Sequence, residues 1–205
     1  MDPAKAINHL RKVDSDLAQV ILRIGKFELR PDKSRSIYAS LIRSIVYQQL
    51  TGKVAAIIFS RFLDLFPDRK FPEPQRVLHM PFERLRGVGL SSQKANYICN
   101  IAKAEKDGIV PDSRRANRMS DDELVEQLTS IKGVGRWTVE MLLIFRLGRP
   151  DVLPATDYGV QKGFALAKHL AKMPNPKELL TAGECWAPYR TAAAWYLWRI
   201  ADTTN

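Results

Sequence analysis

The sequence predicts an all-α protein. Apolar residues recur every three or four positions along most of the 205 residues. No stretch shows the sustained alternation of apolar and polar residues that is typical of a β-strand. Glycine and proline stand at several points where the helical patterns stop. We therefore expect helices throughout, and at most a minor sheet.

In the N-terminal half, apolar residues at helical spacing predict four helices. Their expected ranges are about 7–24, 34–50, 52–66 and 91–107. Gly25 and Gly108 follow the first and the last of these patterns and are typical stops. Ser91 or Ser92 can cap the fourth helix at its start.

In the C-terminal half, four more helices are expected. Their ranges are about 120–130, 136–147 and 156–170, and the last opens near Pro188. Ser120 with Glu123 forms a capping-box pattern at the first of these starts. Gly148 ends the second, and either Asp157 or Thr156 caps the third.

The chain is strongly basic. Lysine and arginine together number 32, against 22 aspartate and glutamate residues, which gives a formal net charge of +10. The basic residues are spread along the chain rather than confined to one tail. A charge of this size favours a polyanionic partner, and nucleic acid is the commonest one. A generally basic protein without such a partner is the alternative.

The two cysteines, Cys99 and Cys185, are too few for a disulfide framework or a metal cluster. Each lies in an apolar helical pattern, so we expect buried, reduced thiols. We see neither a secretory pattern at the N-terminus nor an apolar run long enough for a membrane span. The expected location is intracellular: the cytoplasm or nucleoid of a prokaryote, or the nucleus of a eukaryote.

A glycine turn between two predicted helices is the most informative motif. It reads Ile131-Lys-Gly133-Val-Gly135 and is followed by the helix that starts at Arg136. Glycine permits positive φ and close backbone approach, and a helix start leaves N–H groups that suit a phosphate. Lys132 and Arg136 add positive charge beside the turn. An ordinary turn between helices, with no ligand, is the alternative.

A second segment resembles this turn. Leu85-Arg-Gly87-Val-Gly89 precedes the helix at 91–107 in the same way. Both segments therefore predict two helices joined by a glycine turn.

Several motifs in order resemble the helix-hairpin-helix (HhH-GPD) DNA glycosylase superfamily. The hairpin, the Trp137-Thr138 pair after it and an aspartate beyond the next helix are similar to the superfamily as a whole. The segment Gly89-Leu-Ser-Ser-Gln-Lys94 and Trp186-x-Pro188-x-Arg190 resemble its alkylpurine branch, the 3-methyladenine DNA glycosylase II group. The resemblance implies two helical lobes with the active-site cleft between them.

On this resemblance we expect one lobe over 35–110, carrying a bend that enters the minor groove. The second lobe would combine 1–34 with 111–205 and carry the hairpin and the catalytic aspartate. The segment from Val110 to Met119 is the expected passage between the lobes.

Departures from related branches narrow the expected chemistry. Lyase members of the superfamily carry a lysine nucleophile just after the hairpin, where this chain has Trp137. A Schiff-base mechanism therefore lacks its amine. The four-cysteine iron–sulfur motif of another branch is absent from this sequence, and the chain resembles the compact form without an N-terminal β-domain. We expect a monofunctional enzyme that requires no cofactor.

Asp157 is the expected catalytic residue. A carboxylate at a helix start is often only an N-cap, which is the alternative. The resemblance implies catalysis, because the family's aspartate at this motif position is catalytic. Breaking a base–sugar bond builds positive charge on the deoxyribose, which an ionised carboxylate stabilises.

The resemblance also implies a pocket for an extruded, electron-poor base. The expected pocket residues are Trp137, Met141, Tyr158 and Trp198. Aromatic walls suit such a base through cation–π stacking. Met141 stands where the alkylpurine branch can have an aromatic residue, and core packing is the alternative for each tryptophan.

Other residues are expected to bind DNA. By resemblance, the bend Gln48-Gln49-Leu50-Thr51 enters the minor groove, with Gln49 filling the gap left by the flipped nucleotide. Backbone contacts are expected from Lys132, Gly133, Val134, Gly135 and Arg136, and from Ser91, Ser92 and Lys94. For the two serines, helix capping is an equally good interpretation.

Hairpins of this family can hold a Na⁺ or K⁺ ion on backbone carbonyls. Thr129, Ile131 and Val134 would supply those oxygens here. This expectation rests on the resemblance alone.

The sequence therefore predicts a glycosylase that removes alkylated purines from double-stranded DNA in base excision repair. We expect a monomer, with 3-methyladenine as the substrate and 7-methylguanine as a further candidate. Two alternatives stay open: a noncatalytic helix-hairpin-helix DNA-binding protein, and a glycosylase for another lesion such as hypoxanthine or ethenoadenine.

Overall fold

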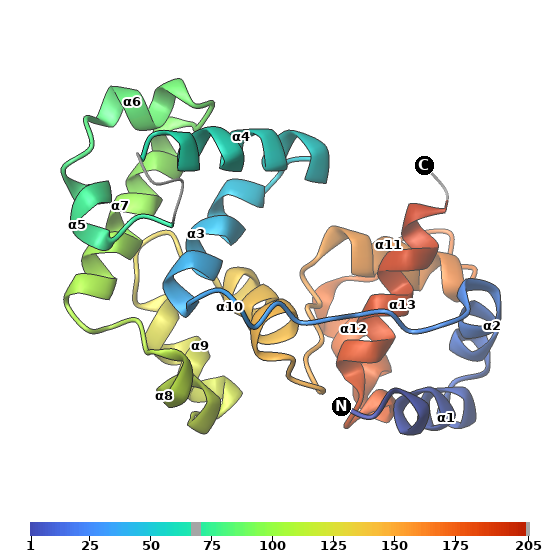
Figure 1. Cartoon of the computed structure of the whole chain (residues 1–205). Helices are drawn as coiled ribbons and strands as arrows, with labels where there is room; N and C mark the ends of the chain where they lie inside the picture. Colours follow the sequence, from blue (N-terminus) through green and yellow to red (C-terminus); the bar gives the residue numbers. More distant parts are fainter. Residues whose placement is uncertain (67–70, 204–205) are drawn as a thin grey trace. The chain divides into compact units, whose positions relative to one another are not determined.

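A computed structural model of the chain describes residues 1–66 and 71–203. Every regular element in this part of the chain is helical (Figure 1). The all-α prediction is confirmed. In the described part, no helix is both long and apolar enough to cross a membrane.

The chain forms two compact units. Unit 1 combines Met1–Pro31 with Leu143–Asn205, and unit 2 is Asp32–Leu142. We expected residues 111–142 in the same lobe as the N-terminus, whereas the structure groups them with unit 2. The physical reason is packing: the two hairpin helices, α9 (Asp121–Thr129) and α10 (Arg136–Leu142), pack on each other, and α10 also packs on α3 (Ile37–Tyr47). The expected passage at 110–119 lies inside unit 2.

Unit 2 contains eight helices among its described residues. They are α3 (Ile37–Tyr47), α4 (Gly52–Asp64), α5 (Pro74–Leu78), α6 (Phe82–Gly87), α7 (Ser92–Lys106), α8 (Ser113–Arg118), α9 (Asp121–Thr129) and α10 (Arg136–Leu142). Side chains of Ser36, Thr51, Ser91 and Ser120 accept N–H groups at four of the helix starts. The predicted capping box of Ser120 and Glu123 is present.

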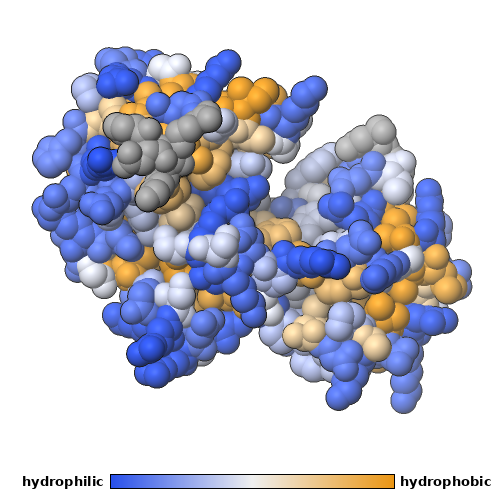
Figure 2. Space-filling model, viewed as in Figure 1, coloured by the Kyte–Doolittle hydropathy of each residue, from blue (hydrophilic) through white to orange (hydrophobic). Residues whose placement is uncertain are grey.

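Helix α3 is the centre of unit 2. Its predicted inner residues Ile37, Leu41, Ile42, Ile45 and Val46 are all buried. Helices α4, α7 and α10 pack around it. Each buried aliphatic side chain contributes roughly 1.5–3 kcal/mol, so α3 fixes the positions of its neighbours. On the face shown in Figure 2, most surface is hydrophilic, but apolar surface shows along α4, where Val54 and Ile57 are exposed.

Unit 1 is also helical in its described part. Its elements are α1 (Pro3–Val13), α2 (Ser15–Ile24), the π-helical η1 (Leu143–Leu147), α11 (Tyr158–Ala167), α12 (Pro176–Ala182), the 3₁₀ turn η2 (Gly183–Trp186) and α13 (Arg190–Asp202). The single helix expected over 7–24 is two helices. The backbone of Asp14 is extended, with φ −144°, and its side chain accepts the first N–H groups of α2. This residue ends one helix and caps the next.

Helices α11 and α13 pack very closely. A Cβ atom at Gly163 of α11 would lie 1.9 Å from the carbonyl oxygen of Leu197 in α13. Only glycine permits this approach of the two backbones. The contact fixes α11, which Asp157 caps, against the helix that carries Trp198.

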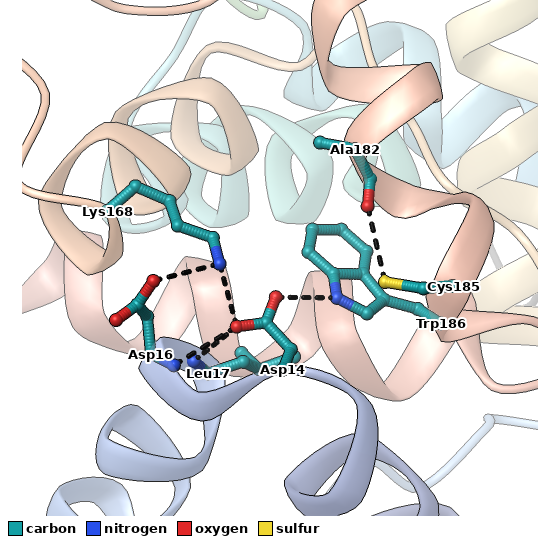
Figure 3. Close-up of polar contacts among 7 residues, drawn as sticks. All are labelled: Asp14, Asp16, Leu17, Lys168, Ala182, Cys185 and Trp186. Carbon is teal, nitrogen blue, oxygen red and sulfur yellow. Dashed lines mark hydrogen bonds and ion pairs between the residues drawn. The ribbon is translucent and has the colours of Figure 1, made fainter.

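A buried polar cluster joins α2 to the C-terminal helices of unit 1 (Figure 3). Asp14 is 6% exposed and accepts hydrogen bonds from Lys168 Nζ at 2.7 Å and Trp186 Nε1 at 2.9 Å. Burial raises the pKa of Asp14. The hydrogen bonds from Leu17 N–H, Lys168 and Trp186, with the charge of Lys168, outweigh burial and lower the pKa below its ordinary value.

The two thiols differ in environment. Cys99 is half-buried, whereas Cys185 is exposed on η2, where its Sγ donates to the carbonyl of Ala182 at 3.4 Å. The expectation of two buried thiols is therefore wrong for Cys185, because η2 is a short surface turn rather than part of a long helix. Both thiols are free.

Candidate DNA-binding hairpin and catalytic aspartate

The hairpin between α9 and α10 has two glycines with different roles. Gly133 has φ +104°, and a Cβ atom there would lie 2.2 Å from the ring of Tyr97. The amide of Asn100 donates to the carbonyl of Lys132 at 3.0 Å. Helix α7 thus supports the turn through Tyr97 and Asn100. Sequence reasoning missed both of these residues, because only the fold brings them to the hairpin.

Gly135, in contrast, is not required by the packing of the protein. A Cβ atom there would meet nothing within 4 Å, and its φ is not positive. In the described residues, no backbone carbonyl accepts from the N–H groups of Gly135 and Arg136. Open space and helix-start N–H groups together form the kind of place where a phosphate oxygen binds.

The turn before α7 has the same backbone form, in a different register from the one expected. Gly89 has φ +104°, so it corresponds to Gly133, and Ser91 stands where the hairpin has Gly135. The Oγ of Ser91 accepts the N–H of Lys94 at 3.2 Å. The helix start that the hairpin leaves open is therefore capped at α7, as the alternative interpretation of Ser91 held. Ser92 is the exposed first residue of α7.

The bend between α3 and α4 presents Gln49 to solvent. Gln49 is exposed and has φ +55°, a left-handed conformation that costs a non-glycine residue about 1–2 kcal/mol. Leu50 beside it is 38% exposed, and Thr51 caps α4. The side chain of Gln48 turns inward and donates to the hydroxyl of Thr138 at 3.0 Å. Gln49, Leu50 and Thr51 are thus the exposed residues of the bend.

Lys94 is engaged within unit 2. Its Nζ donates to the carbonyls of Val46 at 2.9 Å and Gln48 at 2.7 Å. Burial lowers the pKa of this half-buried lysine. The structure gives Lys94 a place at the C-terminal end of α3, where a cation is favoured. It does not extend into solvent as a phosphate-binding side chain would.

One hollow of about 490 Å³ joins these parts of unit 2. Among its lining residues are Gln48, Gln49, Ser91, Lys94, Tyr97, Thr129, Ile131, Lys132, Gly133, Val134 and Gly135. Most of the residues expected to bind DNA therefore surround a single surface feature. Arg136 lies outside the lining, and its guanidinium pairs with Glu140 at 3.1 Å.

The three residues expected to hold a monovalent cation lie together in this hollow. Thr129, Ile131 and Val134 all line it. The carbonyl of Ile131 accepts the N–H of Val134, whereas no backbone N–H of the described residues donates to the carbonyls of Thr129 and Val134. Neutral carbonyl oxygens of this kind suit Na⁺ or K⁺.

Asp157 of unit 1 is held on one oxygen by two donors. It is the N-cap of α11, and its Oδ1 accepts the N–H of Val160 at 3.0 Å and the Nε1–H of Trp198 at 2.8 Å. The side chain is half-buried. A Cβ atom at Gly159 would lie 2.9 Å from the indole of Trp198, so glycine leaves room for this contact. Asp157 is both a cap and an oriented carboxylate.

The loop that leads to Asp157 is tied to the start of α13. Arg190 binds the carboxylate of Asp151 through two nitrogens, at 2.8 and 2.7 Å. The hydroxyl of Thr191 accepts the N–H of Val152 and donates to the carbonyl of Arg149. Arg190, the arginine of the Trp186-x-Pro188-x-Arg190 motif, therefore holds the start of α13 to the loop that leads to Asp157.

The expected pocket residues fall in both units. Within unit 1, the ring of Trp198 stacks on Phe145, with centroids 5.5 Å apart and an angle of 30°. Tyr158 is 66% exposed. Within unit 2, Trp137 is half-buried on α10 and Met141 is 8% exposed. Phe145 is 41% exposed and was missed, although it follows Trp137 at helical spacing in the sequence.

These observations define a class of protein. The hairpin offers helix-start N–H groups to a phosphate backbone, and a second unit presents an oriented carboxylate beside an indole ring. The class is that of a helix-hairpin-helix DNA-binding protein with a candidate catalytic aspartate.

The chain belongs to the HhH-GPD superfamily of base excision DNA repair proteins, whose profile matches residues 42–188. It is 42% identical to the DNA-3-methyladenine glycosylase 1 of Schizosaccharomyces pombe, over 98% of this chain and 90% of that protein. It is also 34% identical to the alkylbase DNA glycosidase-like protein mag2 of the same organism, over 97% and 94% of the two chains.

Solved structures agree with the fold. The S. pombe 3-methyladenine DNA glycosylase Mag1, in complex with abasic DNA, superposes with a TM-score of 0.89 over 95% of each chain. A DNA-3-methyladenine glycosidase from Bacillus halodurans, 34% identical, has a TM-score of 0.81 over 100% of this chain and 91% of its own.

Proposed function

We propose that the protein is a monofunctional DNA glycosylase that excises alkylated purines from double-stranded DNA. The substrates would be 3-methyladenine and 7-methylguanine, and the product an abasic site for base excision repair. The protein would act as a monomer, without a required cofactor, in the compartment that holds genomic DNA. The observation that carries this proposal is the carboxylate of Asp157, oriented by Val160 N–H and Trp198 Nε1–H.

The chemistry follows from the charge that develops during cleavage. As the N-glycosidic bond breaks, the deoxyribose becomes cationic, and the carboxylate of Asp157 stabilises it electrostatically. The same carboxylate can orient or deprotonate the attacking water. A purine methylated at N3 or N7 is already a cationic leaving group, so the site needs no strong general acid.

Recognition of the base would depend on aromatic rings. A cationic purine stacks on indole and phenyl faces with roughly 0.5–2 kcal/mol per good contact. Trp198 and Phe145 of unit 1 form a stacked pair, and we assign this pair to the task. The names of the relatives above support an alkylated purine as the substrate.

Unit 2 would bind duplex DNA. The N–H groups around Gly135 would bind a phosphate, and Gln49 would occupy the gap left by the flipped nucleotide. The carbonyls of Thr129, Ile131 and Val134 would hold a Na⁺ or K⁺ ion, which supplies positive charge beside the phosphate. The DNA-bound Mag1 structure supports DNA as the partner.

The test is the release of bases from methylated DNA. Duplex DNA treated with a methylating agent is incubated with the protein, and the free bases are identified by chromatography. We expect 3-methyladenine and 7-methylguanine, with abasic strands that break only on alkali treatment. Release of hypoxanthine or ethenoadenine alone, from matched substrates, would assign another lesion. Binding without release from any substrate would indicate a noncatalytic DNA-binding protein.

A further inference from the structure

The bend between α3 and α4 is tied to two other helices of unit 2. Lys94 of α7 donates to the carbonyls of Val46 and Gln48. From the other direction, the amide of Gln48 donates to the hydroxyl of Thr138 on α10. Three hydrogen bonds therefore hold the residue that directly precedes Gln49, and the end of α3 before it.

These bonds have physical reasons to be firm. The last carbonyls of a helix lack intrahelical donors, and a lysine ammonium supplies both hydrogen bonds and charge there. Thr138 is 1% exposed, so its hydroxyl gives the amide of Gln48 a fixed, buried anchor. Gln49 itself is exposed and has φ +55°, a conformation that needs support from its surroundings.

The same bonds connect the bend to the hairpin. Thr138 is the third residue of α10, the helix that starts at the phosphate-binding turn. The N–H of Thr138 donates to the carbonyl of Gly135 at 2.9 Å. A displacement of the bend relative to the hairpin would have to break the contact between Gln48 and Thr138.

We propose that Lys94 and Thr138 are positioning residues that hold the bend in a preformed shape. Gln49 would then enter the duplex at a fixed distance from the phosphate bound at the hairpin. This inference rests on the proposed function. Neither residue needs to touch the base or the sugar. Their effect should appear only where the base stack has to be opened and then filled.

Paired and unpaired lesions distinguish this role. Extruding a base costs least when it is already unpaired. A loose bend should therefore slow excision of a paired lesion and spare excision of the same lesion in a single-base bulge. A general folding defect or a lost phosphate contact would slow both substrates alike.

The experiment measures single-turnover excision of 3-methyladenine from the paired and the bulged duplex. Lys94→Met keeps the aliphatic stem and removes the charge, and Thr138→Val removes the hydroxyl. Lys103→Met is the matched control, because Lys103 is an exposed lysine on the same helix. We expect Lys94→Met to lose at least about 10-fold on the paired lesion and less than about 3-fold on the bulge, with a smaller loss of the same kind for Thr138→Val. The control should match the wild type.

A conservative variant and a fluorescence measurement also test the positioning role. Lys94→Arg, which retains the charge, should recover most of the paired-lesion rate. A 2-aminopurine placed beside the lesion should brighten less with Lys94→Met than with the wild type, since the base stack is opened less. Equal losses on both substrates, or no loss on either, would overturn the positioning role. A wild-type protein inactive on both substrates would instead overturn the proposed function.

Discussion

The indole nitrogen of Trp198 donates a 2.8 Å hydrogen bond to Oδ1 of Asp157, and Gly159 leaves the space in which the two side chains meet. The indole therefore orients the carboxylate, while its ring face stacks on Phe145. A single residue links the charge that would stabilise the sugar to the aromatic surface that would recognise the base.

Asp157→Asn should reduce base excision by about 100-fold or more, because the developing positive charge loses its preorganised anion. Asparagine keeps a side-chain oxygen that can accept from Val160 N–H and Trp198, so the helix cap should survive. The measurement is single-turnover release of 3-methyladenine, together with duplex binding by fluorescence anisotropy. Unchanged turnover would remove Asp157 from the mechanism, and loss of binding and turnover together would point to misfolding.

Trp198→Phe should lower the rate of base release about 10-fold or more, because a hydrogen bond to a charged group is worth roughly 1.5–3 kcal/mol. The phenyl ring can still stack on Phe145, so the affinity for substrate should change little. Phe145→Leu is the comparison, since it removes the stacked partner and leaves the indole N–H in place. We expect it to raise KM for methylated DNA more than it lowers kcat. If Trp198→Phe mainly raised KM and Phe145→Leu mainly lowered kcat, these roles of the indole N–H and the stacked ring would be contradicted.

The contrast between the two hairpin glycines shows what the sequence can and cannot predict. The motif located the turn, but only the structure shows that Gly133 packs on Tyr97 while Gly135 faces open space. Most helices with long apolar patterns were predicted well, and the exception is the single helix expected over 7–24, which is two helices. Short ones such as α5 and α8 were missed, because five or six residues are too few to show a period.

Long-range polar contacts could not be predicted at all. Lys94 reaches carbonyls 46 and 48 residues earlier in the chain, and no local pattern indicates such a partner. The same holds for Asp14, whose position between two apolar segments hid a helix break. The candidate catalytic residue itself was named from its motif, and the structure adds the two donors that orient it.

Gly133→Ala and Gly135→Ala form a matched pair. Alanine at Gly133 meets both a left-handed backbone and the Tyr97 ring, so we expect a loss of about 2–4 kcal/mol in unfolding free energy. Alanine at Gly135 has room and should cost less than about 1 kcal/mol. Duplex affinity should nevertheless fall about 10-fold in Gly135→Ala, because the added methyl group stands where a phosphate would approach. Denaturant titration and anisotropy give the two quantities. Full DNA affinity in a stable Gly135→Ala variant would contradict phosphate binding at this turn.

The buried cluster in Figure 3 predicts a stability effect that is independent of DNA. Asp14→Ala should lower the unfolding free energy by about 2–4 kcal/mol, the sum of a lost N-cap and a buried N–H group left without an acceptor. It removes the cap of α2 and leaves Trp186 Nε1–H without its acceptor. Lys168→Met is the milder control, because it removes the charge but keeps the cap and the Trp186 contact. We expect thermal and denaturant unfolding to show that the wild type is the most stable of the three proteins, Lys168→Met is intermediate and Asp14→Ala is the least stable.

The same cluster should make stability depend on pH in a defined direction. The fold holds the pKa of Asp14 below its ordinary value of 3.8, so the stabilisation from this carboxylate is fully present above that pH and is lost as the pH falls below it. The pKa of Lys168 is raised above its ordinary value of 10.5. Burial of Lys168 opposes this rise, but its hydrogen bonds to Asp14 and Asp16 and their charges outweigh burial, so its stabilisation is lost only as the pH rises past 10.5. The difference in unfolding free energy between wild type and Asp14→Ala should therefore be constant from about pH 5 to 9 and shrink toward either extreme. A difference that stayed constant down to pH 2.5 would show that Asp14 stabilises the fold without its charge.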